Sequence, residues 1–415
     1  MKPHAYRRCG RRCSALLAGA GLAALVLASA AGAAAPEANE WPVWRGPDGT
    51  GISAETGWRA DWSAEPPKTL WKVKVGQGFS AVSVAGGRLY TMGNTEGTDT
   101  VWCLNPDSGE VIWKHSYPCK PHDHPGPRCT PTVDGDVVYT LSNRGDLFCL
   151  EAATGKVKWE VKVPQAFGAE PPQWGFACSP LVLGKMLVLD VGPTVALDKA
   201  TGKEIWKSGS DKAGYGSPYA FQMGGETLIA TFPEFGPRVV KAADGKELGR
   251  VRWKTAWGVN AVTPIVEGNT MFISSGYNVG AALFEVSANG LKALWKNKNM
   301  RNHANNCVLW KGYLYGFDGQ VNEGRLTCIE YKTGEKKWSE GSLKAGGLMM
   351  VDGKLVLMAS SGECAVVEAS PDACKILGRT KILEGTCWTQ PVLVGGRIYC
   401  RNHPGDLVCL DVRAK

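Results

Sequence analysis

Short apolar and polar runs alternate along the chain in a pattern that predicts β-strands joined by tight turns. The stretch from Arg128 to Trp159 shows it clearly, because β-branched and aromatic residues there are separated by Asp, Asn, Thr and Gly residues that favour turns. Four strands are expected, at residues 130–133, 137–141, 147–150 and 157–159. The connections are short enough for antiparallel hairpins, and no helical period is present. The stretch therefore predicts one four-stranded antiparallel sheet.

This unit recurs along the chain, and most copies close with a tryptophan. The last turn of a copy holds Thr or Ser, then Gly, then Lys or Glu, as in Thr154-Gly155-Lys156 before Trp159. The closing residues are Trp113, Trp159, Trp206, Trp253, Trp295 and Trp338, at steps of 46, 47, 47, 42 and 43 residues. A period of this length with strand-like runs inside it is typical of propeller blades. We expect the glycine to supply a left-handed turn position and the tryptophan to pack between neighbouring blades.

Counting the copies predicts an all-β fold, an eight-bladed β-propeller of four-stranded antiparallel blades. The blades should start near Phe79, Arg128, Ala177, Ser217, Asn260, His303, Gly346 and Trp388. The last blade supplies three strands and lacks a tryptophan, whereas residues 70–73 form an unassigned strand that carries Trp71. We therefore predict that this N-terminal strand closes the ring as the outer strand of the last blade, which leaves no exposed sheet edge. A seven-bladed ring would leave Trp71 or the unit 351–377 without a place.

The first 33 residues have the features of a secretory leader. Basic residues precede an apolar stretch from Leu16 to Ala30, and Ala31-Gly32-Ala33 offers a cleavage site of small residues. We assign residues 1–33 to a cleaved signal peptide, 34–69 to an N-terminal extension and 70–415 to the propeller. The expected location is the periplasm or the cell exterior. An uncleaved anchor is the alternative, since the apolar run 15–35 is nearly long enough to span a bilayer.

The charge of the mature chain gives no reason to expect nucleic-acid binding. The full sequence has a formal net charge of +8, but the predicted leader holds five of the basic residues and no acidic one, which leaves +3. No basic cluster remains. Partners are therefore expected among proteins and small ligands, and the chain is expected to be a monomer.

The cysteines are expected to be mostly buried thiols. Cys103, Cys149, Cys328 and Cys409 occupy one equivalent strand position in different blades. Packed sheets lie about 10 Å apart, and a disulfide needs Cα atoms within roughly 7 Å, so these cysteines cannot pair with one another. They are interpreted as small buried hydrophobes. Cys119 and Cys129, which flank one blade-joining loop, are the only candidate pair.

The repeated phrase, which covers nearly all of residues 70–412, resembles the pyrroloquinoline-quinone (PQQ) repeat. It is similar to the eight-bladed propellers of quinoprotein alcohol dehydrogenases and of BamB-type outer-membrane assembly subunits. Trp41-Pro42-Val43-Trp44-Arg45-Gly46-Pro47 and Gly126-Pro127-Arg128 resemble the exported PQQ-like propellers of planctomycete-type bacteria. The resemblance implies the fold and a place in the cell envelope, where such a propeller binds or scaffolds other proteins. It does not by itself fix the function.

A quinoprotein dehydrogenase is the competing interpretation. The resemblance implies that such an enzyme holds PQQ under a disulfide between two adjacent cysteines, beside a calcium or lanthanide ion and an Asp base. This sequence contains no Cys-Cys dipeptide and no Cys-x-x-Cys-His haem site. We therefore expect a non-catalytic binding or assembly propeller without a cofactor, and keep a PQQ-dependent enzyme as the alternative.

One loop carries a metal-ligating cluster, His122-Asp123-His124, between prolines and near Cys119. Two imidazoles, a carboxylate and a thiol could bind zinc or copper. The competing interpretation is a solvated surface loop stiffened by proline, in which these side chains bind nothing.

The residues just before each inner strand should ring one mouth of the central channel. The ones named as a candidate ligand site are Arg128, Trp174, Tyr215, Trp257, Asn260, Arg301, His303 and Trp388, and the same positions include Phe79, Phe176 and Gln390. Aromatic walls with a few donors are typical of a ligand or peptide site. His303 is expected to titrate near neutrality. The competing interpretation is that the aromatic residues merely fill the channel.

Overall fold

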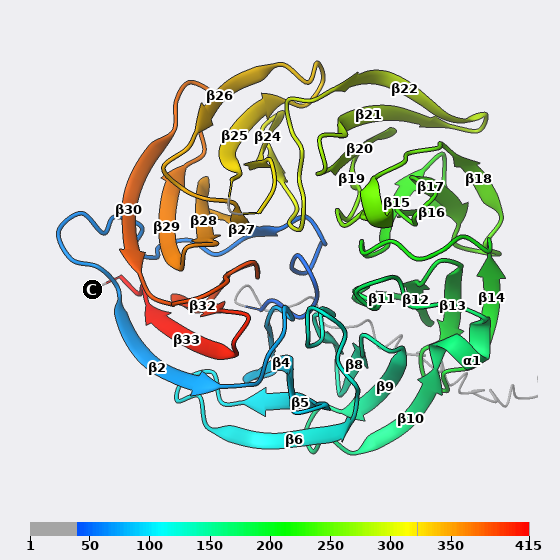
Figure 1. The fold of residues 1–415 in the computed structure, drawn as a ribbon, viewed down its shortest axis with the longest axis horizontal. Helices are drawn as coiled ribbons and strands as arrows, with labels where there is room; N and C mark the ends of the chain where they lie inside the picture. The colour runs from blue at the N-terminus through cyan, green and yellow to red at the C-terminus, as the bar shows by residue number, and fades with distance from the viewer. Residues whose placement is uncertain (1–39, 322, 415) are drawn as a thin grey trace, which may run out of the picture. The chain divides into compact units, whose positions relative to one another are not determined.

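The structure, a computed structural model, describes residues 40–321 and 323–414. The predicted leader lies outside the described residues. Eight sheets surround a central axis (Figure 1). The prediction of an all-β, eight-bladed propeller is therefore confirmed.

Each blade is an antiparallel sheet of four strands. Blade 1 consists of β3 (Ser83–Ala85), β4 (Arg88–Thr95), β5 (Thr98–Leu104) and β6 (Val111–Pro118), and blade 2 of β7 (Thr132–Asp134), β8 (Val137–Leu141), β9 (Asp146–Glu151) and β10 (Val157–Lys162). Blade 3 consists of β11 (Leu181–Leu183), β12 (Met186–Asp190), β13 (Thr194–Asp198) and β14 (Glu204–Ser208), and blade 4 of β15 (Tyr219–Met223), β16 (Glu226–Thr231), β17 (Arg238–Lys241) and β18 (Glu247–Arg250).

Blades 5 to 8 follow the same order, with two additions from the N-terminal region. Blade 5 consists of β19 (Ile265–Glu267), β20 (Thr270–Ser275), β21 (Gly280–Ser287) and β22 (Gly290–Asn297), and blade 6 of β23 (Val308–Trp310), β24 (Tyr313–Asp318), β25 (Arg325–Glu330) and β26 (Lys336–Glu340). Blade 7 consists of β27 (Gly346–Val351), β28 (Lys354–Ala359), β29 (Glu363–Glu368) and β30 (Lys375–Lys381), with β1 (Ile52–Ser53) as an added strand beside β27. Blade 8 consists of β31 (Val392–Val394), β32 (Arg397–Arg401), β33 (Asp406–Asp411) and the N-terminal strand β2 (Lys68–Lys74).

Closing tryptophans join most blades to the next one. The indole N–H donates to a backbone carbonyl of the next blade, as from Trp113 Nε1 to Ala152 O at 2.9 Å, except that Trp253 Nε1 donates to Ser275 Oγ at 3.1 Å. The Trp113 ring lies against the glycine of the next blade's last turn, since a Cβ added to Gly155 would be 2.5 Å from that ring. The repeat glycine is therefore required for its positive φ of 72° and for this close approach. Equivalent pairs are Gly109 with Trp71, Gly202 with Trp159, Gly245 with Trp206 and Gly334 with Trp295.

The N-terminal strand closes the ring as predicted. β2 pairs antiparallel with β33, and Trp71 lies opposite Cys409. The Trp71 indole donates to Pro106 O of blade 1 at 3.0 Å, so it joins blade 8 to blade 1 just as the repeat tryptophans join the other blades.

The segment before β2 crosses the ring and bonds to blades far apart in the sequence. Its contacts are Trp41 with Val84, Pro42 O with Val133 N, Trp44 with Thr263, Arg45 with Cys307 O, β1 in parallel with β27, and Glu55 with the amides of Gly395 and Gly396. In Figure 1 its dark blue trace runs through the middle of the ring. Residues 41–55 therefore tie blades 1, 2, 5, 6, 7 and 8 together.

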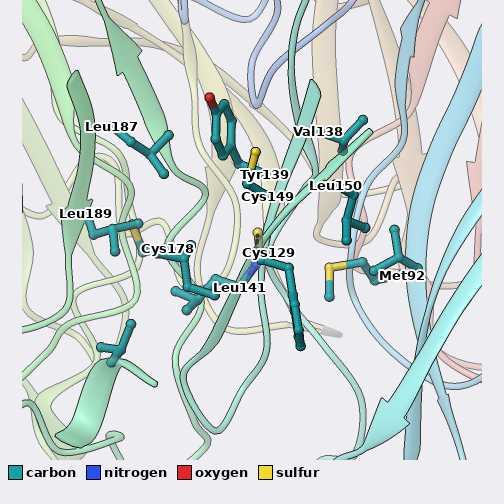
Figure 2. Packing of buried hydrophobic residues seen from close by; sticks show 14 of the residues in the cluster. Met92, Cys129, Val138, Tyr139, Leu141, Cys149, Leu150, Cys178, Leu187 and Leu189 are labelled. Atoms are coloured by element: carbon teal, nitrogen blue, oxygen red, sulfur yellow. Dashed lines mark hydrogen bonds between the residues drawn. The ribbon is translucent and has the colours of Figure 1, made fainter. Parts of the chain in front are cut away.

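The cysteine sulfurs lie in the packed core. Cys103, Cys149, Cys328 and Cys409 are at most 1% exposed, and burial raises the pKa of Cys149 to about 11. Figure 2 shows Cys129, Cys149 and Cys178 among leucine and valine side chains of blades 2 and 3. Cys119 and Cys129 are free thiols, and Cys119 donates to Asn143 Oδ1 instead.

The blade connections contain two short helical turns that the sequence pattern did not predict. α1 (Val163–Phe167) has Pro164 in its first turn and ends at Gly168 with φ 66°, and the 3-10 helix η1 spans Ala256–Gly258. Both are too short to show a helical period. Among the residues the structure describes, no helix has the length and apolar character needed to cross a membrane.

Candidate functional site

A cavity of about 210 Å³ lies where the blade connections meet on one face of the ring. Its walls are mainly aromatic. They consist of Trp44, Phe79, Trp174, Tyr215, Tyr277 and Trp388, with His124, His303 and Arg128 and a set of small or polar residues that includes Ser179, Ser217, Thr263, Thr389 and Gln390. An apolar concavity with a few polar groups is the usual form of a small-molecule site.

A relay of side-chain hydrogen bonds fixes this lining. The amide of Thr130 donates to Ser179 Oγ at 2.9 Å, and the amide of Ser179 donates to Ser217 Oγ at 2.9 Å. The amide of Ser217 donates to Thr263 Oγ1 at 3.4 Å, and that of Thr263 to Asn306 Oδ1 at 3.2 Å. Each bond links a blade to the next one, so the cavity walls are held by successive blades.

Trp44 comes from the N-terminal segment and completes the lining. Its indole N–H donates to Thr263 Oγ1 at 3.0 Å. The adjacent Arg45 is 2% exposed. Its guanidinium donates to the carbonyls of Gly49, Thr50 and Cys307 at 2.7–3.1 Å. Burial lowers the pKa of Arg45 to about 10, which still leaves it charged at neutral pH. The hydrogen bonds of Arg45 therefore hold the N-terminal segment in place, and with it the adjacent Trp44.

Aromatic rings pack in two groups around the cavity. Phe79 stacks on Trp388 with centroids 5.5 Å apart, and the Arg128 guanidinium lies over the same ring at 5.3 Å. In the other group the rings of Trp174 and Tyr215 are 5.9 Å apart.

Two residues of the lining carry hydrogen-bond donors that have no partner. Trp388 Nε1 and Gln390 Nε2 are buried and make no hydrogen bond. Arg128 donates to the carbonyls of Gly126 and His124 at 3.2 and 2.9 Å. Burial lowers its pKa to about 10, so it remains a cation at neutral pH. The residues that line the cavity include no carboxylate. Unsatisfied buried donors are costly, so this wall suits a ligand with acceptor oxygens.

His303 lies in the wall but does not titrate near neutrality as expected. Its ring packs edge-on against Tyr277 at 4.8 Å. Burial lowers the pKa of His303 to about 4, because the imidazolium would lose its hydration there. The expectation of a group that changes charge near pH 7 is therefore wrong for this residue, which is neutral at that pH.

Five of the eight residues named as a candidate site line the cavity together, namely Arg128, Trp174, Tyr215, His303 and Trp388, as do Phe79 and Gln390. Whether they bind a ligand stays a prediction. The structure places the other three outside the lining, which corrects their expected position at the channel mouth.

The three displaced residues have other surroundings. Trp257 is 67% exposed. Asn260 is fully buried and donates to Pro233 O and Glu234 O. Arg301 is held by Asp318, from its Nε to Oδ1 at 2.7 Å. Phe176, from the wider set of mouth positions, is 1% exposed and belongs to the core. Sequence position fixed the connection but could not fix which way each side chain points.

The cluster His122-Asp123-His124 does not converge. His124 lines the central cavity, whereas His122 and Asp123 line a second, more polar cavity of about 640 Å³ beside Lys74, Gln77 and Glu96. Burial lowers the pKa of His122 to about 4. Within residues 40–414, position 322 apart, no three His, Cys, Asp or Glu residues are grouped to hold a metal ion. The expected metal set is therefore not assembled, and only His124 of the three lines the central cavity.

The sequence interpretation missed three residues with aromatic rings among those that line the cavity. Trp44 lies in the quoted N-terminal motif, whose two tryptophans and arginine were a visible signal outside the repeat. Tyr277 lies in a hairpin loop rather than a blade connection, and His124 was named only as part of the candidate metal cluster. No repeat position marks any of them.

Comparison with known proteins agrees with this architecture. A family model described as outer membrane protein assembly factor BamB matches residues 97–340. A 157-residue region, 35% of this chain, is 29% identical to the serine/threonine-protein kinase AfsK of Streptomyces griseus, of whose length the chain spans 18%.

Two solved structures illustrate the likeness. BamB from Moraxella catarrhalis superposes with a TM-score of 0.61 at 15% identity, covering 84% of this chain and 99% of that one. A quinohemoprotein alcohol dehydrogenase from Comamonas testosteroni gives 0.64 at 13% identity, covering 91% of this chain and 81% of that one. At such identities the likeness shows the fold alone.

Proposed function

Because the chain belongs to the PQQ-repeat family described as outer membrane protein assembly factor BamB, we propose that it is an exported, non-catalytic binding propeller of the cell envelope. Export would use the leader 1–33, and the family supports protein partners in the envelope. We further propose that the central cavity binds a small ligand or a peptide group. It suits an apolar, planar body that carries an oxyanion such as a carboxylate.

One observation supports the ligand proposal: two residues on one wall of the cavity, called the donor wall, carry hydrogen-bond donors without an acceptor. Trp388 Nε1 and Gln390 Nε2 lack acceptors, and the charged Arg128 lies over Phe79, whose ring stacks on Trp388. An oxyanion would satisfy these donors with charge-assisted hydrogen bonds. The other aromatic rings of the lining would cover the rest of the ligand.

The residues do not fit the PQQ–metal pair of a quinoprotein dehydrogenase. Acceptor oxygens of an anionic quinone would match the donors, but no carboxylate lines the cavity to hold a calcium ion. The sequence also lacks the pair of adjacent cysteines. For these reasons binding is favoured over alcohol oxidation.

The test is a titration of the purified mature protein with indole-3-acetate and 4-hydroxybenzoate, and with the matching neutral amides. We expect the carboxylates to raise Tm and bind at least tenfold more tightly than the amides, a difference of about 1.4 kcal/mol. Gln390→Glu should abolish the preference, because it brings a like charge to the donor wall. The matched control is Gln222→Glu, at the exposed position of strand β15.

Two results would contradict the proposal. Equal binding of the acids and the amides would show that the cavity does not recognise an oxyanion. Stoichiometric uptake of PQQ with calcium, seen by its absorbance and accompanied by dye-linked alcohol oxidation, would favour the dehydrogenase instead. The envelope role has a separate readout, which is reproducible co-purification with outer-membrane assembly proteins after cross-linking in cells.

A further inference from the structure

Trp257 is exposed in a way that no other large apolar residue of residues 40–414 is. It is 67% exposed, whereas the other exposed apolar residues are aliphatic and lie on outer blade strands. Its backbone has φ 60° and ψ 17°, the left-handed region that bulky residues rarely adopt. An exposed aromatic residue held in an unfavourable conformation suggests a function that requires it.

The loop that carries Trp257 is held from inside. The buried Asn260 amide donates to Pro233 O at 2.8 Å and to Glu234 O at 3.2 Å. Its oxygen accepts from Thr255 at 3.3 Å and from Ser275 at 3.1 Å. These bonds pin the loop to blade 4 and to the hairpin of blade 5. Trp257 is therefore presented in one orientation, which lowers the entropy cost of binding a partner.

Two exposed cations precede Trp257 in the same blade connection. Arg252 and Lys254 are exposed, and no ion pair among the described residues includes either of them. The Arg250 and Arg252 guanidiniums lie over the half-buried Phe235 ring at 4.7 and 5.7 Å.

Nearby carboxylates offset only part of this positive charge. Asp211 is engaged by Arg238 and Arg250. Glu234 packs along the backbone at Gly258, where an added Cβ would lie 2.7 Å from Glu234 Cγ, and its single charge faces the two cations Arg252 and Lys254. Trp, Phe and Arg together are the residue types enriched at interface hot spots.

We propose that Phe235, Arg252, Lys254 and Trp257, here called the rim surface, form a docking site for an acidic segment of a partner protein. An apolar side chain of that segment packs on Trp257, and its carboxylates pair with Arg252 and Lys254. Val259 and Ala261 of the same connection line the central cavity. The partner therefore sits at the edge of the cavity mouth. This inference does not depend on a ligand in the cavity.

The experiment uses the full mature chain and a blocked peptide of alternating Glu and Leu residues, with a Gln-for-Glu peptide as its counterpart. We expect the acidic peptide to bind at low salt and to weaken as salt rises, and the Gln peptide to bind at least tenfold less tightly. Trp257→Gly should reduce binding at least tenfold while leaving Tm unchanged or higher, because glycine adopts this φ freely. A structural role alone would not separate these two readouts.

Charge-reversal variants test the second half of the proposal. Arg252→Glu with Lys254→Glu should abolish acidic-peptide binding, whereas Lys158→Glu on the exposed strand β10 should leave it unchanged. Trp388→Phe in the cavity should also leave it unchanged, which separates this surface from the proposed ligand site. Undiminished binding to the Trp257→Gly protein would overturn the proposal. So would self-association that is lost in Trp257→Gly when no peptide binds, because the occupant would then be a second copy of the chain.

Discussion

The blades and the N-terminal segment 40–67 stabilise the same ring by opposite means. The blades use one contact repeatedly, with an indole N–H on a neighbouring carbonyl and an indole face on a glycine, as for Trp113 and Gly155. The N-terminal segment uses each contact once, as in the three carbonyls gathered by Arg45 and the two amides held by Glu55.

The difference teaches where specificity can arise in a repeat fold. Contacts between neighbouring blades are local, so the ring needs no central support until it closes. The N-terminal segment instead links blades that are far apart in the sequence, and it delivers Trp44 to the cavity. A repeated scaffold thus obtains an individual site from a part of the chain that does not repeat.

The largest expected effect comes from removing the closing strand. Deleting residues 36–75 removes β2 and leaves the edge of β33 open, so we expect aggregate and no soluble monomer. Deleting 36–67 keeps β2 and should yield a soluble ring with a lower Tm and no binding in the cavity. Size-exclusion chromatography and thermal melting distinguish the two. A soluble, cooperatively melting 36–75 deletion would show that closure by β2 is dispensable.

A single substitution can test how much the N-terminal segment contributes to stability. Arg45→Met keeps the aliphatic stem but leaves three carbonyls without their donor, and we expect a loss of about 3 kcal/mol of unfolding free energy. Urea denaturation measures it. Lys158→Met on the exposed face of β10 is the control and should change stability by less than about 0.5 kcal/mol. A similar, small loss in both variants would mean that the segment only lies on the ring.

The same contrast explains how much the sequence could predict. The blades, their number and the closure by Trp71 follow from a period, and every inner strand starts within five residues of its predicted start. The cavity was predicted less well, because the repeat does not determine the conformation of the connections between blades. Arg128 and Trp388 point inward, whereas Trp257 and Arg301 are turned away by local backbone geometry and by Asp318. Trp44 reaches the site through contacts between distant residues, which no pattern within one unit encodes.

The pH dependence of stability tests the burial of the cavity wall. The pKa of His303 is lowered to about 4 in the folded protein, whereas the unfolded chain binds a proton near pH 6.5. Stability should therefore fall as the pH drops from 6.5 to about 4. From pH 7 to 5 we expect the parent to lose about 2 kcal/mol more than His303→Gln. Urea unfolding at both pH values measures this, and parallel losses would place His303 in contact with solvent.

The smallest effect isolates the contact that the blades repeat. Gly245 and Gly224 belong to the same blade and have positive φ values of 71° and 60°. A Cβ at Gly245 would lie 2.5 Å from the Trp206 ring, whereas a Cβ at Gly224 would meet nothing within 4 Å. Both alanine variants bear the backbone cost of about 1 kcal/mol, so that cost cancels in the comparison. Gly245→Ala should lose about 1 kcal/mol more, because the indole must move from its seat and strain its bond to Ala242 O. If urea denaturation gives equal losses of unfolding free energy for the two variants, Gly245 is required only for the turn. The packing of the Trp206 ring would then not depend on the absence of a Cβ at this position.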